Sequence, residues 1–166
     1  MMQDNRERLI RYLNDMWAVE KALVGTLKDM ADEVSDPQLK AMFEQHRQET
    51  HQQEENLEAR IRALGEEPKK VEGFFHQVGA KMGDALDAGH AHYEKNVQDL
   101  MKAYATEHLE MAMYQALEAF ASAIGDTETA QLALRHLQQE RATAEKIWAQ
   151  IGPFSTRSTT QQARAA

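Results

Sequence analysis

Glutamate recurs at positions where the periodicity of a packed helix calls for apolar side chains. In the first segment, apolar residues follow one another in steps of three and four, and Glu20 takes the position that completes their stripe. Acidic residues interrupt three later segments in the same way, at Glu49, at Glu107 or Glu110, and at Glu140. A carboxylate that faces a dry core costs several kcal/mol unless it is neutralised. Four such groups in one interior predict bound cations, and therefore a metal site. The stripe of the first segment consists of Leu9, Leu13, Met16, Leu23, Leu27 and Met30.

Composition favours one all-helical domain. The chain has 166 residues, a length typical of a single domain, and only 8 glycines and 3 prolines. Helix-forming residues are plentiful, whereas runs of β-branched residues are missing. A formal net charge of −8 argues against nucleic acid as a partner, because nucleic-acid binding requires a basic face.

The absence of cysteine limits the chemistry. Disulfides, thiol catalysis and thiolate ligands are excluded, so a metal must be held by carboxylate, imidazole or amide groups. No apolar run approaches the length of about 18 residues that spans a membrane, and the N-terminus lacks the apolar stretch of a secretory signal. We therefore expect no membrane partner and a cytoplasmic location.

Helix start and stop signals divide the chain into two helical hairpins. The first pair runs from Asp4 to Val34 and from Pro37 to the stop at Gly65 and Pro68, and the second pair runs from His90 to Ile124 and from Thr127 to Ile151. Residues 66–89 form a long crossover that contains a short extra helix. This layout predicts a ferritin-like up-down four-helix bundle over residues 1–153. Gly152 and Pro153 are expected to end the last helix, and residues 154–166 form a flexible polar tail.

A weak internal duplication relates the two hairpins. A shift of 90 residues places Glu20 on Glu110 and His46 on His136. It also superposes the turn residues Asp36 and Asp126. Two related hairpins would arrange equivalent ligands about a two-fold axis.

The glutamates are expected at one height in the bundle. Glu20 lies 16 residues before Asp36 and Glu49 lies 13 after it, while Glu110 and Glu140 lie 16 before and 14 after Asp126. With a rise of about 1.5 Å per residue, the members of each hairpin differ in height by only a few ångströms. All four therefore fall near the middle of the bundle.

Imidazoles accompany these carboxylates. His46 precedes Glu49 by three residues on the same helical face, Glu107 precedes Glu110 by three, and His136 precedes Glu140 by four. A site rich in carboxylate with some imidazole favours iron or manganese over copper or structural zinc. Two divalent ions would balance four carboxylate charges. The predicted metal ligands are Glu20, His46, Glu49, Glu107, Glu110 and Glu140.

Less specific interpretations remain open for several of these residues. An interior glutamate could pair with a buried lysine or arginine, although those residues fall on the outer faces. Glu107 could line the rim of the site, and His46, His108 and His136 could be ordinary packing residues. The aromatic residues Trp17, Tyr104, Tyr114 and Trp148 are interpreted as core packing, and the acidic run from Gln52 to Glu58 as a solvated helix face.

Four segments resemble the YciF/YciE-type ferritin-like family of bacterial stress-associated proteins. They are residues 18–23 (AVEKAL), 46–50 (HRQET), 107–114 (EHLEMAMY) and 138–146 (QQERATAEK). The resemblance extends over roughly residues 5–151 and implies a ferritin-like bundle, a homodimer and a candidate di-metal centre. The usual di-iron pattern places histidine three residues after glutamate on two helices, whereas Glu49 and Glu140 are followed there by Gln52 and Thr143. This departure argues against efficient ferroxidase chemistry.

The leading functional hypothesis is a ferritin-like protein that binds two iron ions, or manganese, with a stress-related oxidative or peroxide-detoxifying role. Glu20 and Glu110 would be terminal ligands, Glu49 and Glu140 would bridge, and Glu107 could swing. O₂ or peroxide would be the small oxidant, and catalytic turnover is left open. The alternative is a non-enzymatic scaffold or assembly module with a degenerate metal site. A mini-ferritin storage shell is a third hypothesis.

Overall fold

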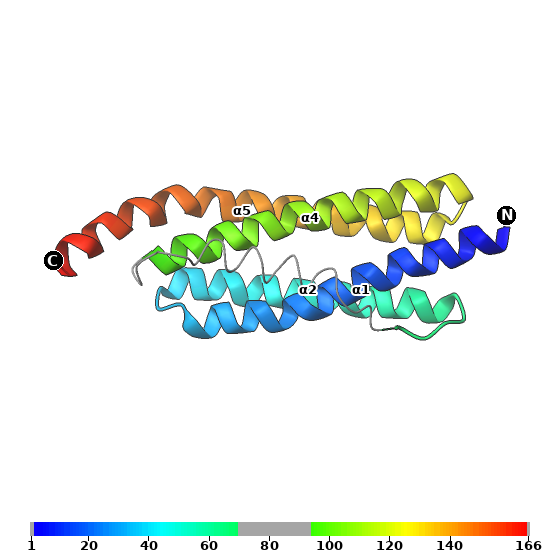
Figure 1. Ribbon diagram of the computed structural model, residues 1–166, viewed down its shortest axis with the longest axis horizontal. Helices are drawn as coiled ribbons and strands as arrows, with labels where there is room; N and C mark the ends of the chain where they lie inside the picture. Colours follow the sequence, from blue (N-terminus) through cyan, green and yellow to red (C-terminus); the bar gives the residue numbers. More distant parts are fainter. Residues whose placement is uncertain (1, 70–93, 166) are drawn as a thin grey trace.

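Four long helices form two antiparallel hairpins that lie one on the other (Figure 1). The structure is a computed structural model that describes residues 2–69 and 94–165, with residues 158–165 as backbone only. Helix α1 (Met2–Glu33) packs along α2 (Pro37–Ala63), and α4 (Lys95–Ile124) packs along α5 (Thr127–Ala165). The hairpins meet through α1 against α4 and α2 against α5. The predicted all-helical, ferritin-like bundle is confirmed, and no strand occurs among the described residues.

Both predicted hairpin turns are built by capping residues. Asp36 has extended backbone angles and accepts hydrogen bonds from the backbone N–H groups of Gln38 and Leu39, at 3.0 and 3.1 Å. These bonds satisfy amides that lack partners at a helix start, and proline at the first helical position leaves no further donor there. At the other hairpin, Gly125 adopts the left-handed conformation with φ of 80°, which ends α4 at little steric cost.

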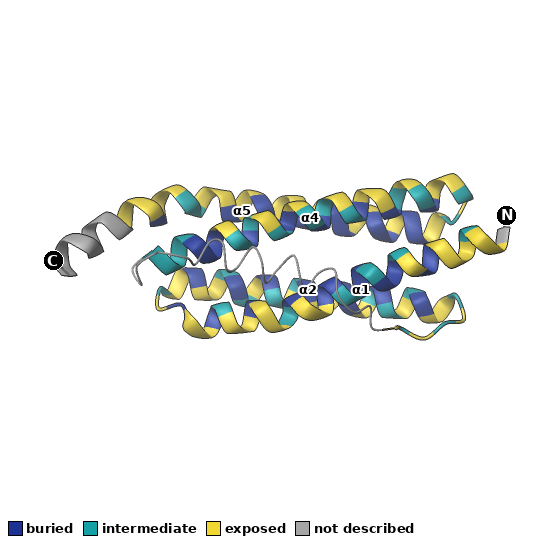
Figure 2. Ribbon diagram, viewed as in Figure 1, coloured by how far each residue is buried: buried dark blue, intermediate teal, exposed yellow. Residues whose placement is uncertain are grey.

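A polar layer divides the core into two apolar halves. In Figure 2, buried residues continue along the bundle on the inward faces of all four helices. On every helix, a buried acid or imidazole of this layer falls between an apolar stretch of one half and an apolar stretch of the other: Glu20 on α1, His46 on α2, Glu107 on α4 and Glu140 on α5. One half contains Leu9, Leu13, Met16, Trp17, Leu57, Ile61, Leu117, Ala121, Ala133 and Leu137, and the other contains Leu23, Leu27, Leu39, Phe43, Leu100, Ala103, Ile147 and Phe154.

The predicted end of the fourth helix at Ile151 is wrong. Helix α5 continues through Pro153 to Ala165, and Figure 1 shows its C-terminal part bending away. Proline removes one backbone hydrogen bond, a cost of about 3 kcal/mol in a helix interior. Phe154 is buried in one of the apolar halves, and full burial of such a side chain returns about 1.5–3 kcal/mol. Packing thus offsets the local stop signal, while the flexibility of residues 154–166 stays a prediction.

Further expectations concern the start of α4, the crossover helix and the two tryptophans. Helix α4 is described only from Lys95, so its predicted start at His90 and the extra crossover helix lie outside the described residues. Trp148 is 63 % exposed, so its interpretation as core packing is wrong, whereas Trp17 is buried as predicted. In the part of the chain that is described, no helix is long and apolar enough to cross a membrane.

Candidate metal centre

Among the described helices, α1, α4 and α5 bring almost fully buried carboxyl groups to the polar layer. Glu20 comes from α1, Glu107 and Glu110 come from α4, and Glu140 comes from α5. None of these side chains is more than 1 % exposed. The spacing of three residues on α4 places Glu107 and Glu110 on one face of that helix. The predicted convergence of these acids at mid-bundle is what the structure shows, and Glu107 lies inside the site rather than at its rim.

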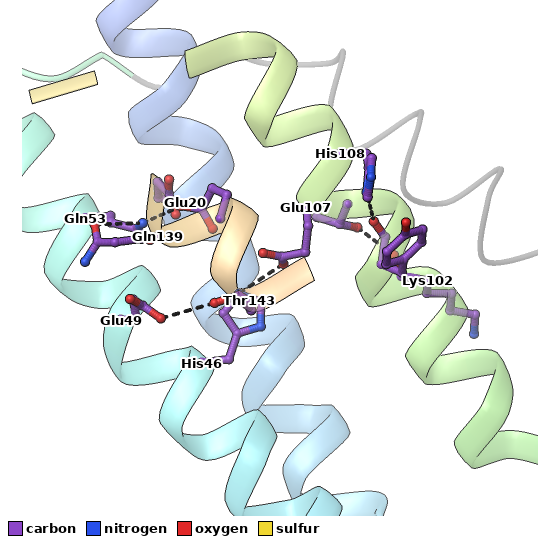
Figure 3. Close-up of polar contacts among 12 residues, drawn as sticks. Glu20, His46, Glu49, Gln53, Lys102, Glu107, His108, Gln139 and Thr143 are labelled. Atoms are coloured by element: carbon purple, nitrogen blue, oxygen red, sulfur yellow. Dashed lines mark hydrogen bonds and ion pairs between the residues drawn. The ribbon is translucent and has the colours of Figure 1, made fainter. Parts of the chain in front are cut away.

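Helix α2 contributes an imidazole in place of a fully buried acid. His46 is only 6 % exposed, and ligand atoms of His46, Glu107 and Glu140 all lie within 4.8 Å of one another. Figure 3 shows His46 and Glu107 directed toward each other. His46 Nε2 lies 3.1 Å from Glu107 Oε1, but the two atoms are not aligned as a hydrogen bond requires. Both imidazole nitrogens and both Glu107 oxygens are therefore buried without a hydrogen-bond partner.

Such unsatisfied groups are rare in folded proteins and call for an explanation. Glu110 Oε2 is a further buried oxygen without a partner. Within the described residues, the ion pairs of lysine and arginine lead elsewhere, for example from Lys21 to Glu54 at 3.1 Å. The cluster thus offers carboxylate and imidazole ligand atoms with no protein cation against them. This donor set fits a divalent metal ion of the iron or manganese type.

Burial and mutual repulsion raise the pKa values of the clustered acids. Burial is the largest cause for Glu20, whose pKa rises to about 8 against the opposing effect of a hydrogen bond from Tyr114. The pKa of Glu140 rises to about 11 through burial and then the charges of Glu20 and Glu107. Burial, followed by repulsion from Glu20 and Glu140, places the pKa of Glu110 well above its ordinary range. Without a cation these groups hold protons at neutral pH, and a bound cation would release them.

Glu49 occupies a different position from the one predicted. Its side chain is half-buried, and Oε2 accepts a hydrogen bond of 3.3 Å from Thr143 Oγ1 on α5 (Figure 3). It lines a cavity of about 20 Å³ between α2 and α5, together with His46, Thr143 and Lys146. That volume is about the size of one water probe. Glu49 therefore lies at the outer side of the cluster, next to His46.

Sequence reasoning missed two buried residues of α2. Gln53 is 1 % exposed and donates from Nε2 to Glu140 Oε1, while Glu54 is 9 % exposed and pairs with Lys21. The prediction that residues 52–58 form a solvated face is wrong at these two positions. Gln53 lies seven residues after His46, two helical turns along the same face, and this spacing was the signal that could have identified it.

Tyr114 is buried in one apolar half, as its interpretation as core packing predicted, and both it and His136 also hydrogen-bond at the polar layer. The Tyr114 hydroxyl donates to Glu20 Oε1, and His136 Nδ1 lies 3.0 Å from that hydroxyl. On its other side, His136 Nε2 lies 3.3 Å from Asn56 Nδ2. His108, in contrast, is exposed, and its Nδ1 contacts the Tyr104 carbonyl at 2.9 Å. His51 is also exposed, while His76, His90 and His92 lie outside the described residues.

Residues 4–161 match the family described as Domain of unknown function (DUF892). The chain belongs to this family. Protein YciF of Escherichia coli K12 is 24 % identical to the DUF892 chain over 152 residues, which cover 88 % of this chain and 89 % of YciF. The resemblance drawn from the sequence is confirmed.

Solved structures support the same conclusion for the fold. A protein of Xanthomonas campestris pv. campestris has a TM-score of 0.80 at 27 % identity, covering 96 % of this chain and 99 % of its own. The Escherichia coli stress protein YciF has a TM-score of 0.80 at 22 % identity, with coverages of 94 % and 98 %. The bacterioferritin of Desulfovibrio desulfuricans, which has a diiron site, has a TM-score of 0.76 at 20 % identity and covers all of this chain and 91 % of its own. At such identity, the likeness to bacterioferritin shows the ferritin-like fold alone.

Proposed function

We propose that this DUF892 chain is a cytoplasmic ferritin-like protein that binds two iron or manganese ions and has a stress-related oxidative or peroxide-detoxifying role. The observation that carries the proposal is the set of buried, unpartnered ligand atoms of His46 and Glu107 beside Glu110 and Glu140. A bound cation would neutralise these groups, and among the described residues no lysine or arginine ion pair with them is found.

The residues divide into two groups by their contacts. His46, Glu107 and Glu140 would hold one ion, because their ligand atoms already lie within 4.8 Å of one another. Glu20 and Glu110 would hold the second, because a hydrogen bond already brings their two carboxyl groups together. Bound iron or manganese would supply redox chemistry toward O₂ or peroxide. The two apolar halves of the core exclude bulk water from this layer and so strengthen its electrostatic interactions.

Glu49 is better suited to cation entry than to bridging. Its half-buried carboxyl lies at the cavity between α2 and α5, where it is held by Thr143 and adjoins His46. We propose that Glu49 takes up a cation from the surface and passes it to the buried ligands.

One observation favours the alternative of a scaffold with a degenerate site. The raised pKa values of Glu20, Glu110 and Glu140 allow these carboxyls to remain neutral and buried when no metal is present. The bundle is therefore compatible with a metal-free core, and metal binding has to be measured.

The deciding experiment is titration of chelator-treated protein with Fe(II) under air. Ultraviolet absorption from oxo-bridged ferric iron, together with two bound metal ions per chain by elemental analysis, is the expected result. Glu107→Gln removes one buried ligand and should abolish the signal. Glu118→Gln is the matched control, because Glu118 is on the same helix but hydrogen-bonds Gln115 and Ser122 outside the cluster. No binding of Fe(II) or Mn(II) by the unaltered chain would leave the scaffold as the remaining hypothesis.

We further propose a homodimer, as the family resemblance implies. Exposed apolar side chains support it: Trp148 is 63 % exposed, Leu134 is 45 % exposed and Met101 is 40 % exposed. The Trp148 ring also packs on Tyr104, with ring centroids 5.2 Å apart, which gives the α4–α5 surface a large aromatic element. Leu134 lies 14 residues before Trp148 on α5, about 21 Å along the helix, so the patch that favours a protein contact is the one formed by Trp148 and Tyr104.

A further inference from the structure

A chain of hydrogen bonds crosses the bundle with one residue from each of the four described helices. Asn56 of α2 contacts His136 of α5 at 3.3 Å, His136 contacts Tyr114 of α4 at 3.0 Å, and Tyr114 donates to Glu20 of α1. His136, Tyr114 and Glu20 are at most 1 % exposed, whereas Asn56 is half-buried. The chain therefore links the outer part of the bundle to one carboxyl of the acid cluster.

The chemistry of the four groups fixes the direction of this chain. Asn56 Nδ2 can only donate, so His136 Nε2 must accept. Burial lowers the pKa of His136 to about 4, which leaves a neutral ring with a single N–H at neutral pH. That N–H is consequently on Nδ1 and donates to the Tyr114 oxygen. The Tyr114 hydroxyl hydrogen is then free to donate to Glu20 Oε1, and every donor points toward the cluster.

The hydrogen-bond chain includes only one member of each pair of residues that the internal duplication relates. The shift of 90 residues pairs His46 with His136 and Glu20 with Glu110. Neither nitrogen of His46 has a hydrogen-bond partner, and Glu110 Oε2 has none. In contrast, His136 hydrogen-bonds Tyr114, and Glu20 accepts a hydrogen bond from Tyr114. The hydrogen-bond chain thus ends directly on Glu20, whereas Glu110 is reached only through its own hydrogen bond with Glu20.

We propose that Asn56, His136 and Tyr114 are positioning residues that fix the orientation of Glu20 and thereby set the affinity of the acid cluster for a divalent cation. This inference rests on the proposed function. Groups that hydrogen-bond a metal ligand orient it, and their loss typically weakens metal binding by about 10- to 100-fold. Asn56 bonds His136 rather than a carboxyl of the cluster, so an effect of Asn56 on affinity would have to pass through His136 and Tyr114.

The test is Asn56→Asp, a substitution of nearly equal shape that replaces the donor with an acceptor. At pH 8 the neutral His136 then turns its N–H to Nε2, and Nδ1 becomes an acceptor for the Tyr114 hydroxyl. Glu20 loses its donor, and the Kd for Mn(II), measured calorimetrically on the full chain, should rise about 10-fold or more. The added negative charge alone would change the Kd in the opposite direction. Gln52→Glu is the matched control, because it adds the same charge one helical turn away on an exposed residue, and its Kd should not rise.

Further variants and a spectroscopic readout complete the test. Tyr114→Phe should weaken Mn(II) binding to a similar extent, and Asn56→Asp should add nothing to it in the double variant. Nitrogen-15 NMR should show the His136 proton on Nδ1 in the unaltered chain and on Nε2 in Asn56→Asp. An unchanged Kd in both Asn56→Asp and Tyr114→Phe, or the Nε2–H form in the unaltered chain, would overturn the positioning role while leaving the proposed function intact. Failure of the unaltered chain to bind Mn(II) at all would instead overturn the proposed function, and this inference with it.

Discussion

Replacement of Glu140 by glutamine tests whether the buried acids destabilise the metal-free fold. The side chain is 1 % exposed, and burial is the main cause that raises its pKa from 4.5 to about 11. Glutamine keeps the shape and the oxygen that accepts from Gln53. Its amide can also donate to the neighbouring Glu107 carboxyl, whose charge contributes to the raised pKa of Glu140. The substitution therefore removes the titratable carboxyl group, while it keeps the shape and the hydrogen bonds of the side chain.

The expected magnitude follows from the two pKa values. Between pH 4.5 and about 11 the folded state holds a proton on Glu140 that the unfolded state has lost, so the free energy of unfolding falls as the pH rises. Each pH unit in this interval corresponds to about 1.4 kcal/mol, so at pH 7 the loss amounts to roughly 3 kcal/mol. Glu140→Gln should recover up to this amount at pH 7, but less than about 1 kcal/mol at pH 5.

Urea denaturation in the presence of chelator, followed by circular dichroism at pH 5, 7 and 8, measures the difference. Glu145→Gln is the control, because Glu145 is an exposed residue of the same helix and should change stability by no more than about 0.5 kcal/mol. Mn(II) at 100 times its Kd should then stabilise the unaltered chain by about 2.7 kcal/mol and the Glu140→Gln variant by much less. Lower stability of the variant at pH 7 without metal, or a gain independent of pH, would refute the reasoning.

Three further perturbations follow from the structure. Glu49→Gln should slow the uptake of Mn(II) in stopped-flow mixing while changing the equilibrium Kd less than Glu107→Gln does, and an equal loss of affinity would instead make Glu49 a ligand. Arg60→Met should lower the free energy of unfolding by about 2 kcal/mol. Arg60 donates to Asp126 at 2.7 and 2.8 Å and to Thr129 at 2.8 Å, and it thereby joins the two hairpins. A thermal melting temperature that shifts by less than about 2 °C would contradict this. Trp148→Glu should convert a dimer to monomers in sedimentation velocity without loss of helical content, and an unchanged sedimentation coefficient would place the contact elsewhere.

Local signals in the sequence were enough to predict the order of the helices, both hairpin turns and the height of the buried acids. Helical periodicity and local stop signals depend only on nearby residues, so Asp36 and Gly125 marked the hairpin turns correctly. A constant rise per residue converts distance from a turn into height, so Glu20, Glu110 and Glu140 could be placed in one layer. The local rule at Pro153 failed because burial of Phe154, a tertiary contact, offsets the lost hydrogen bond.

The division of roles among the residues of that layer depends on how the hairpins pack. His46 and His136 are equivalent under the internal duplication, yet His46 meets Glu107 while His136 bonds Tyr114 and Asn56. The same applies to Glu49, whose bond to Thr143 keeps it at the outer side of the cluster. Periodicity gives the face and height of a side chain but not its partner across the bundle, because the partner depends on how the two hairpins pack against each other.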